Sequence, residues 1–239
     1  MTQQRPTPPL TQRRGPLRDR LVTLAATPDD HSSIEDDLIT IAQLSAQLIA
    51  AASYASVTAR QEDAYTTVAA SDDIAVAVDQ AQYADQTGPC LDALETARPL
   101  SVPDITATMR WPGFRDTAHR LGLHASLSIP LFAGRGQAIA ALNLYGHDST
   151  TMAALTAAVL ATYDGDGLTS PDLDPGGAEL VNGLTIAFAV RAIIQQAIGI
   201  IIAEQHGTPD RAYATLRLRA IDTGNSLIDT ANAVLTEQQ

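Results

Sequence analysis

The feature that most constrains this chain is a helical hydrophobic pattern that continues without a break from about residue 178 to about residue 206. Apolar side chains recur there at the i, i+3, i+4, i+7 spacing of one helix face: Val190, Ile193, Ile194, Ala197, Ile198, Ile201 and Ile202. At about 1.5 Å per residue, such a helix is roughly 40 Å long, which exceeds the core of one small domain. We therefore expect a long helix that links two modules, and 239 residues suffice for them.

The segment that precedes this helix has the shorter period of strands. Its apolar or β-branched runs of strand length lie at 57–60, 65–70, 100–102, 126–132 and 138–145. The cluster Ala133-Gly134-Arg135-Gly136 predicts a hairpin turn between the last two. Helix-like stretches at 72–84, 91–97 and 114–121 lie between the other runs. This order predicts an α+β domain, an antiparallel sheet with flanking helices.

Further helices are expected before the strands, between the strands and the long helix, and after the long helix. One begins after Ser33, a candidate cap, and another runs from about 152 to 163. After the long helix, Thr208 and Pro209 predict the start of a shorter one, and Ser226 or Asn225 predicts the cap of the last. The predicted domains are a flexible, solvated arm at 1–32, the α+β domain at 33–177, and the long helix with a three-helix unit at 178–239.

Charge is distributed unevenly, which limits where a nucleic acid could bind. The formal net charge is −12; residues 21–189 hold six Arg against twenty-one acidic residues, whereas residues 190–239 hold four Arg against five. No basic stripe is present, so the few Arg residues near the end would have to make all phosphate contacts. All fifteen basic residues are Arg, which excludes Schiff-base and P-loop chemistry that needs Lys.

Few residues suggest catalysis or metal binding. Cys90 is the single cysteine, so internal disulfides and multi-thiolate metal sites are excluded, and five scattered His residues predict no metal site. Cys90 lies where a helix start could lower its pKa, but no base can be assigned to it, and an inert apolar role is favoured. Trp111 either lines a ligand pocket or belongs to the core, and its neighbours Pro112 and Phe114 favour the core. We expect no enzyme and no cofactor.

Two further segments bear on location and cation binding. The acidic stretch that starts at Asp164 lacks the Gly and Glu of a calcium loop, with Thr169 and Pro175 in their places, and is interpreted as a flexible connection. No secretory signal is recognised, and Arg191 interrupts the most apolar stretch before it reaches the length of a membrane span. We expect a cytoplasmic protein without a membrane anchor.

Two resemblances cover most of the chain. Residues from about 34 to 165 resemble a GAF domain of the actinobacterial sensory type, through Gln86-Thr87-Gly88-Pro89-Cys90-Leu91-Asp92-Ala93, through Arg110-Trp111-Pro112 with Phe114, and through Ser126-Leu127-Ser128-Ile129-Pro130-Leu131. Residues from about 185 to 236 resemble an ANTAR domain, through Arg191-Ala192-Ile193-Ile194-Gln195-Gln196-Ala197-Ile198-Gly199-Ile200, Ala212-Tyr213, Leu216-Arg217, Ala220 and the run from Leu227 to Ala231. The second is the more specific, because motif and spacing coincide.

The resemblance implies a signal-responsive regulator that binds paired stem-loops in nascent transcripts, favours antitermination and acts as a homodimer. A small-molecule ligand in the GAF domain is also implied, with Cys90 and Trp111 as pocket candidates. The candidate RNA-binding residues are Arg191, Gln195, Gln196, Arg211, Tyr213, Arg217 and Arg219. Tyr213 shares the apolar helix face, which favours a core position over base stacking.

One position departs from the ANTAR pattern. Many ANTAR sequences carry Lys where this chain has Ile198, which we interpret as part of the apolar helix stripe. Ile198 and the nearly neutral end of the chain motivate an alternative, a dimerisation and protein-interaction sensor that has lost RNA binding. A third, weaker alternative is a GAF-type enzyme that uses Cys90.

Overall fold

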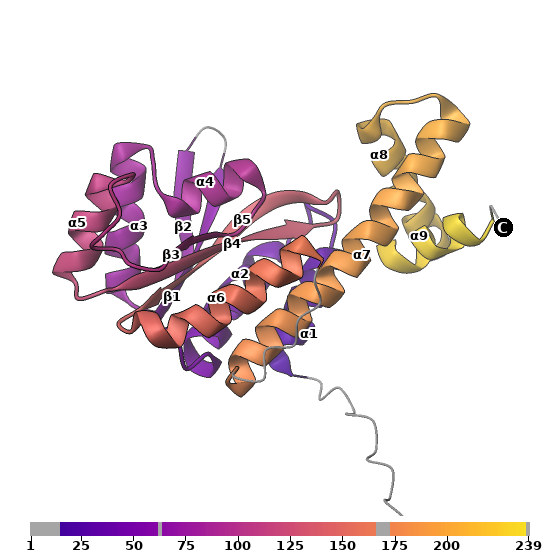
Figure 1. The fold of residues 1–239 in the computed structure, drawn as a ribbon. Coiled ribbons are helices and arrows are strands. Elements are labelled where there is room, and N and C mark those ends of the chain that lie inside the picture. The colour runs from indigo at the N-terminus through magenta and orange to yellow at the C-terminus, as the bar shows by residue number, and fades with distance from the viewer. Residues whose placement is uncertain (1–14, 62–63, 166–172, 238–239) are drawn as a thin grey trace, which may run out of the picture.

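The centre of the molecule is a five-stranded antiparallel sheet in the order β2-β1-β5-β4-β3. The structure is a computed structural model that describes residues 15–61, 64–165 and 173–237 (Figure 1). The strands are β1 (Tyr54–Gln61), β2 (Ala64–Ala70), β3 (Leu100–Val102), β4 (Ala125–Ala133) and β5 (Gln137–Gly146). Each predicted strand is present, and the turn between β4 and β5 is the predicted hairpin, so the expected α+β fold is confirmed.

The two faces of this sheet differ in chemistry because successive strand residues point to opposite sides. Val57, Ile129 and Leu142 lie on an apolar face. That face packs against α1 (Pro16–Ala26), α2 (Ile34–Leu48), α6 (Ser149–Asp164) and the first part of α7 (Pro175–Gln205). Ser56, Ser128 and Asn143 lie on the opposite face and are also buried. That face is covered by α3 (Asp73–Asp85) and α4 (Pro89–Thr96), and α5 (Pro112–Arg120) packs beside them against α3.

Helix α1 corrects the prediction of a flexible arm for residues 16–26. Its side chains Leu17, Leu21 and Leu24 are buried in the main core, and the helix packs against α7 and α2. Gly183 on α7 permits this approach, since a Cβ atom there would lie only 2.7 Å from Leu21 Cδ1. The prolines and arginines around these leucines masked their helical spacing. Residues 1–14 of the predicted arm lie outside the described residues.

The predicted caps are confirmed at two of three helices. Thr208 accepts a hydrogen bond from Arg211 N at the start of α8, and Ser226 accepts one from Asp229 N at the start of α9. Ser33 makes no side-chain cap on α2, because its Oγ atom instead hydrogen-bonds His31 Nδ1 at 2.8 Å. Most of the acidic connection after Asp164, residues 166–172, lies outside the described residues.

The C-terminal unit has a core of its own. The second half of α7 packs against α8 (Pro209–Thr223) and α9 (Leu227–Thr236), as predicted for a three-helix unit (Figure 1). Its buried cluster, which includes Ile194, Ala197, Tyr213 and Leu216, is separate from the core beneath the sheet. Helix α7 therefore belongs to both units. By length and hydropathy alone it meets the criteria for a membrane span, as the core helices of water-soluble proteins also do.

Candidate nucleic-acid interface

The seven candidate RNA-binding residues divide into two groups by their contacts. Four of them, on α7 and α8, contact the sheet domain or the segment between α1 and α2: Arg191, Gln195, Tyr213 and Arg217. The side chains of the other three make no hydrogen bond or ion pair with either segment, within the part of the chain that the structure describes: Gln196, Arg211 and Arg219. The sequence gives no sign of this division, because it depends on tertiary contacts.

On α7, two candidates contact the turn between β4 and β5. Arg191 Nε donates a 2.8 Å hydrogen bond to the carbonyl oxygen of Gly136, and its guanidinium lies 4.0 Å from the centroid of the Phe132 ring. Burial lowers the pKa of Arg191 from its ordinary value. One turn further along α7, the side-chain amide of Gln195 donates to the carbonyl oxygen of Arg135. The side chains of Arg191 and Gln195, which were predicted to face RNA, are therefore hydrogen-bonded to the β4–β5 turn.

On α8, Tyr213 and Arg217 contact a pair of acidic residues that precedes α2. The Tyr213 hydroxyl donates a 3.0 Å hydrogen bond to Asp29 Oδ1, and burial together with the Asp29 carboxylate raises the pKa of Tyr213 to about 12. Only 2% of Tyr213 is exposed, which confirms its predicted core position. Arg217 Nη1 and Nη2 each lie 2.8 Å from a different carboxylate oxygen of Asp30.

The remaining candidates face solvent to different degrees. Gln196 and Arg211 are exposed, and their side chains have no hydrogen-bond or ion-pair partner among the described residues. Arg219 lies 4.0 Å from Glu204 and is half-exposed. Arg217 and Arg219 therefore have different partners, in agreement with the prediction that two positions on a helix separated by two residues point in different directions.

Ile198 lies in the C-terminal core and not on the surface. It is 5% exposed and belongs to the cluster that contains Ala212, Tyr213 and Leu216. The interpretation of Ile198 as an apolar core position is confirmed. A phosphate contact from this position would require the side chain to leave the core.

The buried polar face of the sheet holds a hydrogen-bonded network around Asp79 of α3. Asp79 is fully buried and accepts hydrogen bonds from the Tyr145 hydroxyl at 2.6 Å and from Thr67 Oγ1 at 2.9 Å. Burial raises the pKa of Asp79 to about 6, although these hydrogen bonds oppose the rise. Ser126 and Ser128 on the same face have buried hydroxyls without a hydrogen-bond partner among the described residues.

Sequence reasoning missed Asp79 as a member of a site. The signal was available, because Asp79 and Gln82 share the face of the predicted helix that also carries Ala75 and Val78. Two polar residues on an otherwise apolar face indicate a buried polar partner, and here that partner includes Tyr145.

The two predicted ligand-pocket residues lie on this polar side of the sheet but in different surroundings. Cys90 is completely buried at the start of α4, and burial together with Asp79 raises the pKa of its thiol well above the ordinary value. The helix start therefore does not lower this pKa as the sequence suggested. Trp111 is 5% exposed in an apolar cluster with Phe114, as expected of a core residue, and Arg110 stacks over its ring at 4.7 Å.

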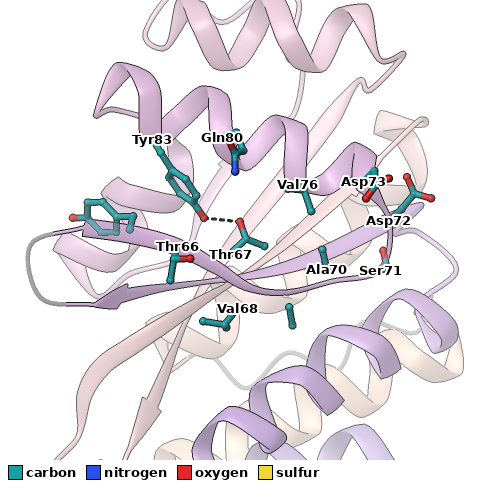
Figure 2. A pocket seen from close by; sticks show the side chains of 12 residues that line it. Thr66, Thr67, Val68, Ala70, Ser71, Asp72, Asp73, Val76, Gln80 and Tyr83 are labelled. Atoms are coloured by element: carbon teal, nitrogen blue, oxygen red, sulfur yellow. Dashed lines mark hydrogen bonds between the residues drawn. The ribbon is translucent and has the colours of Figure 1, made fainter.

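A cavity of about 500 Å³ lies next to this network, between the outer strand β2 and helix α3 (Figure 2). Tyr83, Gln80 and Val76 line it from α3, Thr66 and Thr67 from β2, and Asp72 and Asp73 from the connection and first turn. The Tyr83 hydroxyl hydrogen-bonds Thr67 Oγ1 at 2.9 Å, and Thr67 in turn donates to Asp79. Thr67 therefore lines the cavity and is also hydrogen-bonded to the buried Asp79 carboxylate. Among the described residues, no group of three or more His, Cys, Asp or Glu could hold a metal ion.

Comparisons with known proteins match both parts of the chain. The GAF domain model matches residues 31–162 and the ANTAR domain model matches residues 183–235. No curated protein matches the chain at a significant level.

Solved structures that resemble the chain include a GAF domain/HD domain protein from Geobacter sulfurreducens (16% identity, 75% of this chain and 98% of that one, TM-score 0.41). They also include the nlh2 GAF domain of A. aeolicus in an inactive state (10% identity, 73% and 94%, TM-score 0.41). The GAF match spans more than half of the chain and coincides with the sheet domain. The ANTAR match coincides with the three-helix unit. The chain therefore belongs to the GAF domain family and, with the ANTAR domain that follows, is a signal-responsive regulator of the GAF–ANTAR type.

Proposed function

We propose that this protein controls transcription antitermination by binding paired stem-loops in nascent transcripts, under the control of its GAF domain. The observation that carries the proposal is the division of α7 between two cores. Its first part packs in the core of the region that matches the GAF model, and its second part packs in the core of the region that matches the ANTAR model. A conformational change in the GAF domain could therefore be transmitted to the RNA-binding unit through this continuous helix.

The RNA-binding surface that we propose combines five of the candidate residues of α7 and α8: Arg191, Gln195, Arg211, Arg217 and Arg219. Tyr213 lies in the core beneath this surface, and Gln196 lies on the face of α7 that we assign below to the homodimer contact. Arg211 is the one best placed for an initial contact, because its side chain is exposed and unpaired among the described residues and lies in the first turn of α8. A guanidinium donates two parallel hydrogen bonds to a phosphate or to the edge of a guanine. Unpaired bases of a stem-loop expose such edges.

We place the homodimer contact on the exposed face of α7. Six residues of small or moderate size recur there at alternating spacings of four and three: Thr185, Ala189, Ala192, Gln196, Gly199 and Ala203. This is the heptad spacing of a helix pair, and the small side chains let two helices approach closely. A Cβ atom at Gly199 would meet nothing within 4 Å, so this face is open in the single chain. A parallel pair would bring two ANTAR units together for two stem-loops.

For the GAF domain we propose a polar small-molecule ligand at the buried polar face. The cavity beside Tyr83 and the unpartnered hydroxyls of Ser126 and Ser128 support this class of ligand. Cys90 and Trp111 would act as packing residues there. The raised pKa of the Cys90 thiol argues against a nucleophile, so we propose no enzymatic activity and no cofactor. A target in nascent transcripts places the protein in the cytoplasm.

RNA binding tests the proposal directly. The purified chain is titrated with a transcript of two adjacent hairpins at several salt concentrations. We expect Arg211→Ala to weaken binding and to reduce the slope of log affinity against log salt by about 1, because one phosphate contact is lost. Arg120→Ala, on the exposed side of α5, is the matched control and should change neither quantity. The absence of binding at low salt, with the dimer intact, would contradict the proposal.

The alternative function is a dimeric interaction sensor that has lost RNA binding. The observation that favours it is Ile198, which is buried where many ANTAR sequences carry Lys. The same titration separates the two functions, because the alternative predicts a stable dimer that binds no hairpin transcript at any salt concentration.

A further inference from the structure

We infer that the structure is an autoinhibited state in which Asp29 and Asp30 occupy the positions of RNA phosphates on α8 and the β4–β5 turn holds them there. The inference rests on the proposed RNA-binding function and adds its regulation. It assigns a role to the segment between α1 and α2, which lies between the two units and belongs to the core of neither.

The contact between Arg217 and Asp30 has the geometry of phosphate recognition. Two guanidinium nitrogens of Arg217 each lie 2.8 Å from a separate oxygen of the Asp30 carboxylate. An arginine fork binds the oxygens of a phosphate in the same way, so one Arg217 side chain cannot bind both. Bound RNA and the Asp30 contact therefore exclude each other at this position.

A second acidic contact covers the neighbouring aromatic residue. Asp29 accepts the hydrogen bond of the Tyr213 hydroxyl, and it also lies 3.3 Å from Arg135 Nε in the β4–β5 turn. The Arg135 guanidinium lies 5.4 Å from the centroid of the Tyr213 ring, while Arg217 lies at 5.8 Å from the same ring. Tyr213 is thus enclosed by Asp29 and two arginines.

The β4–β5 turn fixes this arrangement from the GAF side. Gly134 N donates a 2.8 Å hydrogen bond to the carbonyl oxygen of Thr27, which ties the turn to the acidic segment. A Cβ atom on Gly134 would collide with the Tyr213 hydroxyl, so the contact needs glycine at this position. Arg135 Nη1 reaches α8 directly, with 2.9 Å to Asp210 Oδ1. Arg191 and Gln195 bind carbonyl groups of the same turn.

These contacts are of a kind that can be released. The ion pairs among them join partly exposed groups, and pairs of this kind contribute little to stability in water. The two apolar cores are separate, so opening the contact divides neither of them. The turn also leads directly into β5, the strand that carries Asn143 and Tyr145, two hydrogen-bond partners of Asp79. A ligand that binds at the Asp79 network could therefore shift β5 and, with it, the turn at the start of that strand.

RNA affinity of four full-length proteins tests the inference, with the two-hairpin transcript as the probe. The proteins are the wild type, the double variant Asp29→Asn/Asp30→Asn, the variant Arg135→Ala, and the control Asp164→Asn. The control breaks a surface ion pair of 2.6 Å with Arg98, which takes no part in the contacts of the acidic segment. We expect the double variant and Arg135→Ala to bind about five- to tenfold more tightly than the wild type, within the range of ordinary coupling between sites. The control should bind like the wild type.

The variants separate release from simple charge effects. Removal of acidic groups favours RNA binding for any protein, whereas removal of an arginine disfavours it. Tighter binding by Arg135→Ala therefore supports release, and unchanged or weaker binding by this variant overturns the inference. Thermal melts verify that each variant is folded. Equal affinity of all four proteins overturns the inference alone, whereas no binding by any of them at low salt overturns the proposed function and the inference with it.

Discussion

The Tyr145 hydroxyl donates a 2.6 Å hydrogen bond to Asp79 Oδ1 at the fully buried centre of the GAF domain. Tyr145 comes from a central strand and Asp79 from the helix above it, so this bond ties α3 to β5. The carboxylate keeps its place because Thr67 and Asn143 donate to it as well. Its desolvation nevertheless raises the pKa of Asp79 from 3.8 to about 6.

The first prediction concerns the pH dependence of stability. The folded state binds the Asp79 proton more tightly than the unfolded state does, so the free energy of unfolding falls as the pH rises from about 4 to about 6. The difference between the two pKa values corresponds to about 3 kcal/mol. Urea denaturation across this pH range measures it. Asp79→Asn should flatten this part of the profile, and a profile unchanged in the variant would contradict the assignment.

The second prediction compares two glycines of α7. A Cβ atom at Gly176 would collide with the backbone carbonyl of Leu48, whereas a Cβ atom at Gly199 meets nothing within 4 Å. We expect Gly176→Ala to lower the free energy of unfolding by about 2–3 kcal/mol through steric overlap. Gly199→Ala should raise it by up to about 1 kcal/mol, because alanine favours the helix. Urea denaturation of monomeric protein checks both, and the opposite order would contradict the described approach of α7 to α2.

The third prediction tests whether α1 is part of the folded domain. Leu21 is 2% exposed against α7, and its truncation to alanine should cost about 2–4 kcal/mol. Thr23→Ala on the exposed side of the same helix is the control, with an expected change within about 0.5 kcal/mol. Thermal denaturation distinguishes the two. Equal effects would indicate that this segment is a solvated arm after all.

The fourth prediction concerns the departure from the ANTAR pattern. Ile198→Lys places a charged amine in the C-terminal core and should lower the stability of that unit by about 3 kcal/mol or more. Ala233→Lys adds the same charge on the exposed side of α9, outside the proposed RNA-binding and dimer surfaces, and should leave the folding free energy of the chain nearly unchanged. Hydrogen exchange in α8 and α9 reports on this unit. A stable Ile198→Lys variant that binds RNA more tightly would show that this position can face the ligand.

The strands and the long helix were predictable because their patterns are local. The runs at 126–132 and 138–145 are of strand length and flank a turn with two glycines, and the structure has β4, β5 and their hairpin there. Likewise, the apolar stripe that includes Ile194 and Ile201 determined the long helix without any knowledge of its partners. Local spacing also indicated the core position of Tyr213.

The remaining features depend on contacts between segments that are far apart in the sequence. Asp30 and Arg217 are separated by 187 positions, and nothing in the spacing of either indicates the ion pair. The helix around Leu21 was missed because its leucines lie among residues typical of a solvated tail, and its burial depends on α7. The same holds for Arg191 and Gln195, whose partners are carbonyl groups of a turn.

If the GAF domain acts through helix α7 as we propose, this helix would convert a small tilt in the GAF core into a larger displacement of the C-terminal unit. It extends from Pro175 to Gln205, a length of about 46 Å at about 1.5 Å per residue. A tilt of about 5° about Leu184, which is buried in the GAF core, would displace Gln205 by about 3 Å, and that is enough to break a hydrogen bond. On this proposal, the displacement caused by a given tilt increases with distance along the helix, so the C-terminal unit would move more than the part of α7 in the GAF core.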